Sequence, residues 1–278
     1  MSVFPQPPAR AAVLQLERVA CFLGHQLVLD DLNLTVSEGE FVALLGPSGS
    51  GKTTLLRLLA GLARPTSGRV THRGVTVSGA DTSRGLVFQD YALFPWLTMT
   101  GNLALAVGKS RPGLGHRQRT ALAEEFLEMV GLPGTGRKYP FELSGGMRQR
   151  GAIARAFALG SEALLLDEPF GALDPLTRIA LQDLLLGIWG GHAGKKTVLF
   201  VTHDLDEALY LSDRVIVLGS SPGRILADLP LTLPRPRDRE AAPDQTRDLR
   251  REIENLFRRD TRRRLTLSVG ADGDGAGI

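Results

Sequence analysis

The chain has 278 residues, enough to bury one substantial core, or one core with a modest second lobe. Its apolar content of 43% and charged content of 23% are typical of folded globular proteins and argue against wholesale disorder. The 33 basic and 30 acidic residues leave a net charge of +3, too small to indicate a nucleic-acid partner, and we expect none.

The chain up to about residue 219 predicts a mixed α/β domain. Residues 1–10 contain three prolines, lack the features of a signal peptide and predict a disordered leader. Apolar runs of strand length follow at 11–19, 27–36, 40–46, 84–89, 162–168, 197–203 and 214–219. Helical spacing appears at 52–62, 121–132, 147–159 and 175–190. Strands followed by helices indicate a mostly parallel sheet, whose binding residues lie at the carboxyl ends of the strands. The helix-rich stretch at about 91–160 predicts a smaller helical lobe.

The C-terminal part differs in composition. A proline-rich segment at 229–245 precedes a basic stretch in which four apolar residues recur at helical spacing, namely Leu249, Ile253, Leu256 and Phe257. This amphipathic helix either docks on its own domain or contacts a membrane headgroup or a partner. Residues 269–278 predict a disordered tail. No apolar run reaches the length of about 18–20 residues that spans a bilayer, so we expect a chain that is not itself membrane-spanning.

The stretch GPSGSGKTT at 46–54 predicts a phosphate-binding loop, because it follows an apolar strand and begins a helix. Its glycines let backbone N–H groups turn inward around phosphate oxygens. Lys52 adds a positive charge for the β- and γ-phosphates, and Thr53 offers a hydroxyl group to Mg²⁺. The predicted nucleotide-binding residues of this loop are Gly46, Pro47, Ser48, Gly49, Ser50, Gly51, Lys52, Thr53 and Thr54.

Three other strands end in residues suited to the same chemistry. The stretch ALLLDEP at 163–169 is an apolar strand that ends in two carboxylates, Asp167, which can orient Mg²⁺, and Glu168, which can polarise an attacking water. The stretch VLFVTHD at 198–204 is a further strand that ends in His203, which could contact a γ-phosphate. The stretch LVFQD at 86–90 repeats the pattern with Gln89, which could hold a water molecule or a Mg²⁺ ligand. Because these strands are expected to run parallel, the four side chains are predicted to meet at one edge of the sheet.

The stretch LSGGM at 143–147 is a second glycine-rich entrance to a helix. Ser144 lies where an N-cap is expected, and Gly145 and Gly146 leave the N–H groups of the first turn open. It therefore indicates either an anion site without a lysine or an ordinary capped helix with a flexible hinge. The spacing alone does not distinguish the two.

Together these residues resemble the nucleotide-binding subunits of ABC transporters. The resemblance rests on GPSGSGKT, the Gln of VFQD, LSGGMRQR, LLLDEP, GALD and the His of VTHD, which occur in the family's order across roughly residues 14–220. It implies a P-loop NTPase (RecA-like) α/β core with an antiparallel β subdomain and an inserted α-helical subdomain. It also implies ATP and Mg²⁺ as ligands, a nucleotide-binding domain over 11–222 and a C-terminal extension over 223–268.

The family further implies that two copies sit head to tail, each ATP being held by the phosphate loop of one copy and the LSGG stretch of the other. Ser144, Gly145 and Gly146 would then face the partner's γ-phosphate, and Asp174 would lie at the dimer seam. Two departures stand out. The usual adenine-stacking aromatic position is occupied by Leu23, with Phe22 one residue away, and Met147 stands where Gln is commonest in the signature.

A finer resemblance is to importer ATPases of the nitrate/sulfonate/taurine type, through FQDYALFPWLTMTGN at 88–102, LSGGMRQR and the PGRI…LPRPRDR tail at 222–239. It implies a peripheral protein at the cytoplasmic face of the inner membrane that drives a separate permease, served indirectly by a periplasmic or lipoprotein solute-binding protein. The region just after Gln89 would then form the groove for the permease's coupling helix. Alternatively, its aromatic residues belong to the core of the helical lobe.

Two other classes of P-loop protein fit the sequence less well. A soluble ABC-type ATPase of DNA repair would carry a long coiled coil between the Gln and signature motifs, whereas 55 positions separate Gln89 from Ser144. One of translation would carry two cassettes, and this chain has one phosphate loop. A P-loop GTPase would show an NKxD motif, which the sequence lacks, and neither a GTPase nor a small-molecule kinase needs LSGGM.

Overall fold

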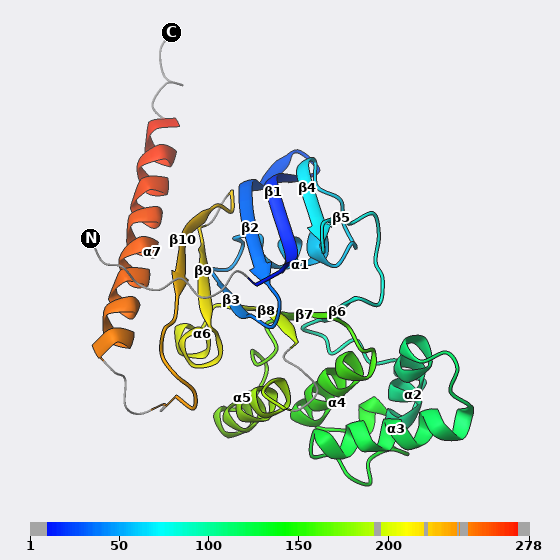
Figure 1. Ribbon diagram of the computed structural model, residues 1–278. Coiled ribbons are helices and arrows are strands. Elements are labelled where there is room, and N and C mark those ends of the chain that lie inside the picture. Colours follow the sequence, from blue (N-terminus) through cyan, green and yellow to red (C-terminus); the bar gives the residue numbers. More distant parts are fainter. Residues whose placement is uncertain (1–9, 192–195, 220–221, 238, 240–243, 272–278) are drawn as a thin grey trace.

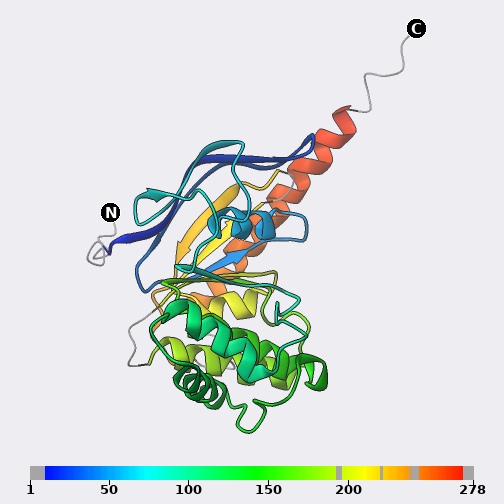
Figure 2. The ribbon, with the colours of Figure 1, turned by 90° about the vertical axis from the view of Figure 1, so that its right-hand side faces the viewer.

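The computed structural model describes residues 10–191, 196–219, 222–237, 239 and 244–271. These residues form two β-sheets, a lobe of helices and a long C-terminal helix (Figure 1). Seen from the side, the smaller sheet covers one face of the larger sheet, and helices cover the other face (Figure 2). Most of the predicted leader and the last seven residues of the predicted tail lie outside the described residues.

The larger sheet has the strand order β10-β9-β3-β8-β7-β6. All neighbours run parallel except β10 and β9, which are antiparallel. The three central strands are buried along their whole length, which explains why they are continuous apolar runs in the sequence. The bounds are β3 (Phe41–Leu45), β6 (Arg84–Val87), β7 (Ala163–Asp167), β8 (Thr197–Thr202), β9 (Arg214–Leu218) and β10 (Ile225–Pro230).

Strand β3 divides the core of the domain. Val42 and Leu44 point to one side, where they pack with α1 (Lys52–Leu59) and the smaller sheet. Phe41, Ala43 and Leu45 point to the other side, where they pack with α5 (Pro175–Trp189) and α6 (Leu205–Leu211). The phosphate loop between β3 and α1 is therefore anchored at both ends in buried structure.

The smaller sheet is antiparallel, with the order β2-β1-β4-β5. Its strands are β1 (Ala12–Leu23), β2 (Gln26–Ser37), β4 (Ser67–His72) and β5 (Val75–Thr76). The sequence predicted the first two as strands but not the last two, which are short and largely exposed. The predicted fold class, a mostly parallel core with an antiparallel β subdomain and an inserted helical subdomain, is confirmed.

The helical lobe lies at the lower right of Figure 1 and has its own small core. It consists of α2 (Met99–Ser110), α3 (His116–Met129), the short 3₁₀ helix η1 (Pro140–Glu142) and α4 (Gly145–Ala158). Helix α4 also packs through Ile153 on the core of the larger sheet, so it connects the two parts. These helices fall within the segment 91–160 that the sequence predicted as a separate lobe.

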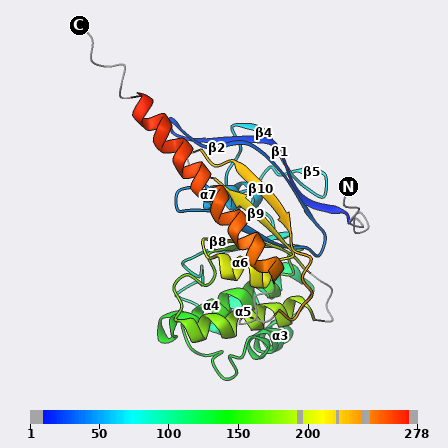
Figure 3. The ribbon, with the colours of Figure 1, turned by 90° about the vertical axis from the view of Figure 1, so that its left-hand side faces the viewer.

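The C-terminal helix α7 (Asp244–Ala271) runs along the edge of the larger sheet beside β9 and β10, with its far end projecting beyond the sheet (Figure 3). Ile253 is fully buried, and Leu249, Leu256 and Phe257 pack against the same core. The apolar face of the amphipathic helix thus docks on its own domain. The helix continues three residues into the predicted tail. Over the described residues, we find no helix with the length and apolarity needed to cross a membrane.

Candidate active site

The phosphate loop has a backbone that requires glycine at several positions. Gly49 and Gly51 have φ values of +79° and +86°, a region that glycine enters without a Cβ clash. At Gly46 the constraint is space, since a Cβ there would lie 2.7 Å from a backbone oxygen of β9. Lys52 Nζ donates hydrogen bonds to the carbonyl oxygens of Gly46 (2.8 Å) and Pro47 (2.9 Å). The lysine therefore lies under the loop, with its charge at the loop's centre.

Buried charges of opposite sign meet beneath this loop. Burial lowers the pKa of Lys52, and the nearby carboxylates of Glu168 and Asp167 oppose that shift. Burial likewise raises the pKa of Asp167, opposed first by a hydrogen bond that the Thr53 hydroxyl donates to it over 3.2 Å. Lys52 Nζ lies 3.9 Å from Glu168 Oε1. Burial therefore shifts the pKa values of Lys52 and Asp167 more than the attraction between their charges does.

Glu168 and His203 meet because they follow adjacent parallel strands, β7 and β8. His203 Nδ1 lies 3.4 Å from Glu168 Oε2, and the His203 side chain is 58% exposed. Glu168 has φ +45°, an uncommon value for a residue other than glycine, and strain of this kind gathers at functional sites. Its amide donates to the carbonyl oxygen of Val201 over 3.1 Å, which holds the strained peptide in place.

A cleft of about 520 Å³ opens above the loop. It brings together the phosphate loop, Gln89 and Glu168, as the sequence predicted. It also contains the start of β2, which sequence reasoning missed because its residues carry no reactive groups. The lining residues are Gln26, Leu27, Val28, Ser48, Gly49, Gly51, Lys52, Thr53, Thr54, Gln89 and Glu168. Neither Phe22 nor Leu23, the two residues considered for adenine stacking, is among them.

The donor groups of the cleft fit a magnesium nucleotide. A Cβ on Gly49 would meet nothing within 4 Å, so the loop presents its backbone openly, and the buried Ser50 hydroxyl has no hydrogen-bond partner. Thr53, Asp167 and Gln89 offer a hydroxyl, a carboxylate and an amide oxygen. Among the described residues no three His, Cys, Asp or Glu side chains cluster as a metal site. A few oxygen ligands suit Mg²⁺, which usually keeps water and substrate phosphate in its shell.

The LSGG stretch begins α4 in the way the capping pattern predicts. Ser144 is the N-cap, and its hydroxyl accepts a hydrogen bond from the Met147 amide over 3.3 Å. Gly146 packs against α5, where a Cβ would lie 2.5 Å from Thr177 Cγ2. Ser144, Gly145 and Gly146 do not line the cleft. Within one chain, the structure leaves this stretch away from the phosphate loop.

Asp174 lies next to this second stretch. It is the N-cap of α5 and accepts a hydrogen bond from the Thr177 amide over 3.0 Å, and hydrogen bonds from Thr177 lower the pKa of Asp174. Since the Thr177 side chain is the neighbour of Gly146, the start of α5 and the start of α4 form one continuous surface.

A second cavity of about 310 Å³ lies beside the site. Gly46, Pro47 and His203 line it on one side, and Phe257, Asp260 and Thr261 of α7 line it on the other. The docked C-terminal helix is therefore a wall of the region around His203. The sequence indicated that α7 is amphipathic but carried no signal for this position.

The segment after Gln89 divides between core and surface. Tyr91 and Leu93 pack against the main core. Trp96 is 71% exposed, with its ring 5.4 Å from that of Phe94. The core interpretation thus holds for Tyr91 and Leu93, whereas the ring of Trp96 is exposed.

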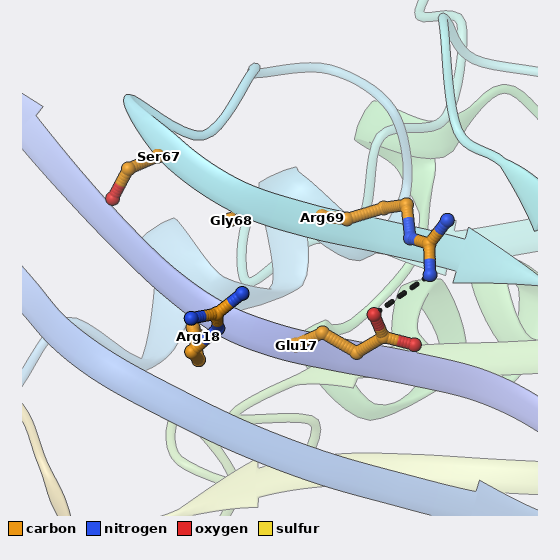
Figure 4. Close-up of a pocket in the computed structure, with 5 residues that line it drawn as sticks. All are labelled: Glu17, Arg18, Ser67, Gly68 and Arg69. Carbon is orange, nitrogen blue, oxygen red and sulfur yellow. Dashed lines mark hydrogen bonds and ion pairs between the residues drawn. The ribbon is translucent and has the colours of Figure 1, made fainter.

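Another hollow, of about 450 Å³, lies on the antiparallel sheet between β1 and β4 (Figure 4). Two of its charged groups, Glu17 and Arg69, are joined over 2.8 Å. A Cβ at Gly68 would lie 2.2 Å from the Arg18 carbonyl oxygen, so the hollow follows from the irregular approach of the two strands. We assign no chemistry to it.

The chain matches the ABC transporter family over residues 29–171. A taurine import ATP-binding protein of Sinorhizobium fredii is 51% identical over 205 residues, 74% of this chain and 75% of that protein. A nitrate import ATP-binding protein of Synechococcus elongatus is 44% identical over 240 residues, 85% of this chain and 87% of that protein. Among solved structures, a dimeric ATP-binding cassette in a post-hydrolysis state with ADP and Pi bound has a TM-score of 0.70 and 34% identity, covering 79% of this chain and 99% of that one.

Proposed function

The chain belongs to the ABC transporter family as an ATPase that uses ATP and Mg²⁺, and from this premise we propose that it is the ATP-hydrolysing subunit of an importer. The observation that carries the proposal is the contact of Glu168 at the cleft with both Lys52 and His203, with the LSGG stretch of the same chain left out of the cleft. Such a site can bind a nucleotide by itself but is complete only with a second copy.

We assign nucleotide binding to the loop Gly46–Thr54. Its inward backbone N–H groups would hold the phosphates, and the buried charge of Lys52 would lie against the β- and γ-phosphates. Thr53, Asp167 and Gln89 would hold Mg²⁺, which when bound neutralises charge on the β- and γ-phosphates. The hydrogen bond from Thr53 to Asp167 supports this assignment because it brings a hydroxyl and a carboxylate together beneath the phosphate loop.

We assign the proton-accepting role to Glu168, with His203 and Gln89 as its catalytic partners. The carboxylate stands at the cleft and can accept a proton from an attacking water. His203 contacts Glu168 Oε2, which fixes the carboxylate's orientation and leaves an exposed imidazole edge for a γ-phosphate. Gln89, on the same lining, would orient the water without competing for its proton.

A head-to-tail pair of chains would complete the site. Ser144, Gly145 and Gly146 of one copy would face the γ-phosphate held by the other, and Asp174 would lie at the seam. The continuity of the α4 and α5 starts supports a shared contact surface there. Because each ATP would bridge two chains, nucleotide binding and association would stabilise one another by linkage.

The importer assignment goes beyond the ATPase and rests on the relatives and on one surface residue. The taurine and nitrate import relatives match over most of their length, which supports uptake of a small solute such as nitrate, a sulfonate or taurine. Trp96 offers an exposed aromatic contact for a permease helix. The chain would then act at the cytoplasmic face of the membrane, supplied by a periplasmic or lipoprotein solute-binding protein. A soluble ABC-type ATPase is the alternative, and it would need no such contact.

Replacing Glu168 with Gln tests the catalytic assignment. The amide cannot accept the proton, so Glu168→Gln should abolish steady-state ATP hydrolysis while ATP still binds and holds the chain as a dimer, measured by filter binding and size-exclusion chromatography. Glu128→Gln, an exposed carboxylate on α3, is the control and should hydrolyse ATP normally. Near wild-type turnover by Glu168→Gln would contradict the role given to Glu168.

A further inference from the structure

The tail that follows β10 is fixed to the end of α6 by alternating arginines. The Arg237 guanidinium donates to the carbonyl oxygens of Leu209 (2.6 Å), Tyr210 (3.2 Å) and Ser212 (2.6 Å). Arg235 donates to the Leu211 carbonyl oxygen and pairs with the carboxylate of Asp213, just after α6. The last carbonyls of a helix lack partners within it and carry its negative dipole end, so arginines suit this position.

The third arginine, Arg239, reaches a different neighbour. Its guanidinium stacks on the Tyr210 ring at 3.6 Å from the centroid and pairs with Asp183 over 2.6 Å. Its Nη1 also donates to Gln182 Oε1 on α5 over 2.6 Å. Gln182 is only 2% exposed, so this hydrogen bond connects the tail to a group inside the domain.

From Gln182 the hydrogen bonds continue to the loop that carries His203. Gln182 Nε2 donates to Glu207 Oε1 over 3.3 Å, and the Thr202 hydroxyl donates to Glu207 Oε2 over 2.6 Å. The same hydroxyl accepts from the amide of Asp204 over 2.9 Å. Thr202 and Asp204 flank His203, so the series begins at the tail and ends on both sides of the histidine. It is called the tail relay below: Arg239, Gln182, Glu207, Thr202.

The relay has one arrangement that satisfies its members. A guanidinium only donates and a carboxylate only accepts, so Gln182 must turn its oxygen to Arg239 and its NH₂ to Glu207. Glu207 is 6% exposed and Thr202 is 2% exposed, where water cannot replace a lost partner. Burial raises the pKa of Glu207, and the hydrogen bond from Thr202 opposes that shift. Removing Arg239 frees the Gln182 amide to turn, which loosens Glu207 and the hydroxyl that it holds.

We propose that Arg239 is a positioning residue for ATP hydrolysis, which acts through the tail relay to hold His203 in place against Glu168. The proposal rests on the catalytic role given to His203 above. It gives a function to the LPRPRDR tail, which the phosphate chemistry itself does not use. The other ion pairs of Glu207 and Asp204, with Arg178, are longer at 3.7 and 3.6 Å and restrain the loop from the α5 side only.

The test compares Arg239→Ala with Arg250→Ala in the full-length chain. Arg250 also belongs to the C-terminal extension and also pairs with α6, at Asp206, but it lies outside the relay. Arg239→Ala should lower kcat for ATP about fivefold to tenfold, the size expected for coupling within one hydrogen-bond network, with the KM for ATP changed less than about twofold. Arg250→Ala should leave both constants unchanged.

Measurements in a His203→Ala background separate the role proposed for Arg239 from the role proposed for His203. With single-turnover assays at high protein concentration, Arg239→Ala should cause no further loss once His203 is absent. The relay would be overturned if Arg239→Ala and Arg250→Ala had equal kcat, or if the KM of Arg239→Ala rose as much as its kcat fell. It would also be overturned if Arg239→Ala lowered the hydrolysis rate just as much in the His203→Ala background. Wild-type hydrolysis by His203→Ala alone would overturn the role of His203 itself, and the relay with it.

Discussion

At the scale of single residues, the phosphate loop separates two uses of glycine. Gly49 and Gly51 share a left-handed backbone but differ in their surroundings. A Cβ at Gly51 would lie 2.5 Å from Leu29 Cδ2 and 3.1 Å from Val28 Cγ1, whereas a Cβ at Gly49 would meet nothing. Gly51 therefore serves the fold as well as the loop, and Gly49 serves the open face of the cleft.

Alanine at the two positions should have different effects. Both variants carry the left-handed cost of about 1–2 kcal/mol. Gly51→Ala adds overpacking, which should lower the free energy of unfolding by roughly a further 1–3 kcal/mol in urea denaturation. Gly49→Ala should lower the free energy of unfolding by little more than this left-handed cost. It should bind ATP more weakly, because its methyl group enters the cleft lining. Equal losses of stability in the two variants would contradict this assignment.

The sequence predicted where the proposed reactive side chains lie better than it predicted their supports. Asp167, Glu168 and His203 were predictable because each ends a strongly apolar strand, and the ends of parallel strands meet at one sheet edge. Gln182 and Arg239 were not predictable as a pair. They are 57 positions apart, and their side-chain types are common on surfaces, so only the tertiary fold reveals that they touch.

At the scale of elements, burial on both faces decided what could be predicted. The central strands and helices α1, α4 and α5 follow clear apolar patterns, and all were predicted within a few residues. Strands β5 and β10 lie at sheet edges, β4 is half exposed, and α6 has only seven residues, so they lack such patterns. The basic helix α7 was predicted as amphipathic, but the partner of its apolar face became evident only from Ile253, buried on the domain itself.

The segment after Gln89 allows a test of permease contact. Trp96→Glu replaces an exposed ring, so it should leave the thermal midpoint and the ATPase rate of the purified chain unchanged. If the ring anchors a permease helix, the substitution should lower the fraction of chain that sediments with native host membranes at least about tenfold, as for an interface hot spot. Val75→Glu, 71% exposed on β5, is the control. Unchanged sedimentation of Trp96→Glu would contradict the contact.

At the scale of the whole molecule, the proposed function makes the cleft and the LSGG stretch two halves of one site. The cleft carries Lys52 and Glu168, with His203 in contact with Glu168, while the LSGG stretch carries capped-helix dipoles and no cation. The missing lysine in LSGG suits a stretch whose positive charge comes from Lys52 of another copy. The proposed head-to-tail dimer would complete the site, and the dimeric cassette with ADP and Pi is a structural precedent for a dimer.

Mixing two inactive variants tests this claim most directly. Lys52→Ala damages the phosphate loop and Ser144→Arg blocks the LSGG stretch, so each homodimer lacks both sites. A mixed dimer keeps one intact site, made of Lys52 from one chain and Ser144 from the other. We expect ATP hydrolysis by the mixture to rise well above that of either variant alone. Hydrolysis no greater than the average of the two separate variants would contradict a site shared between two chains.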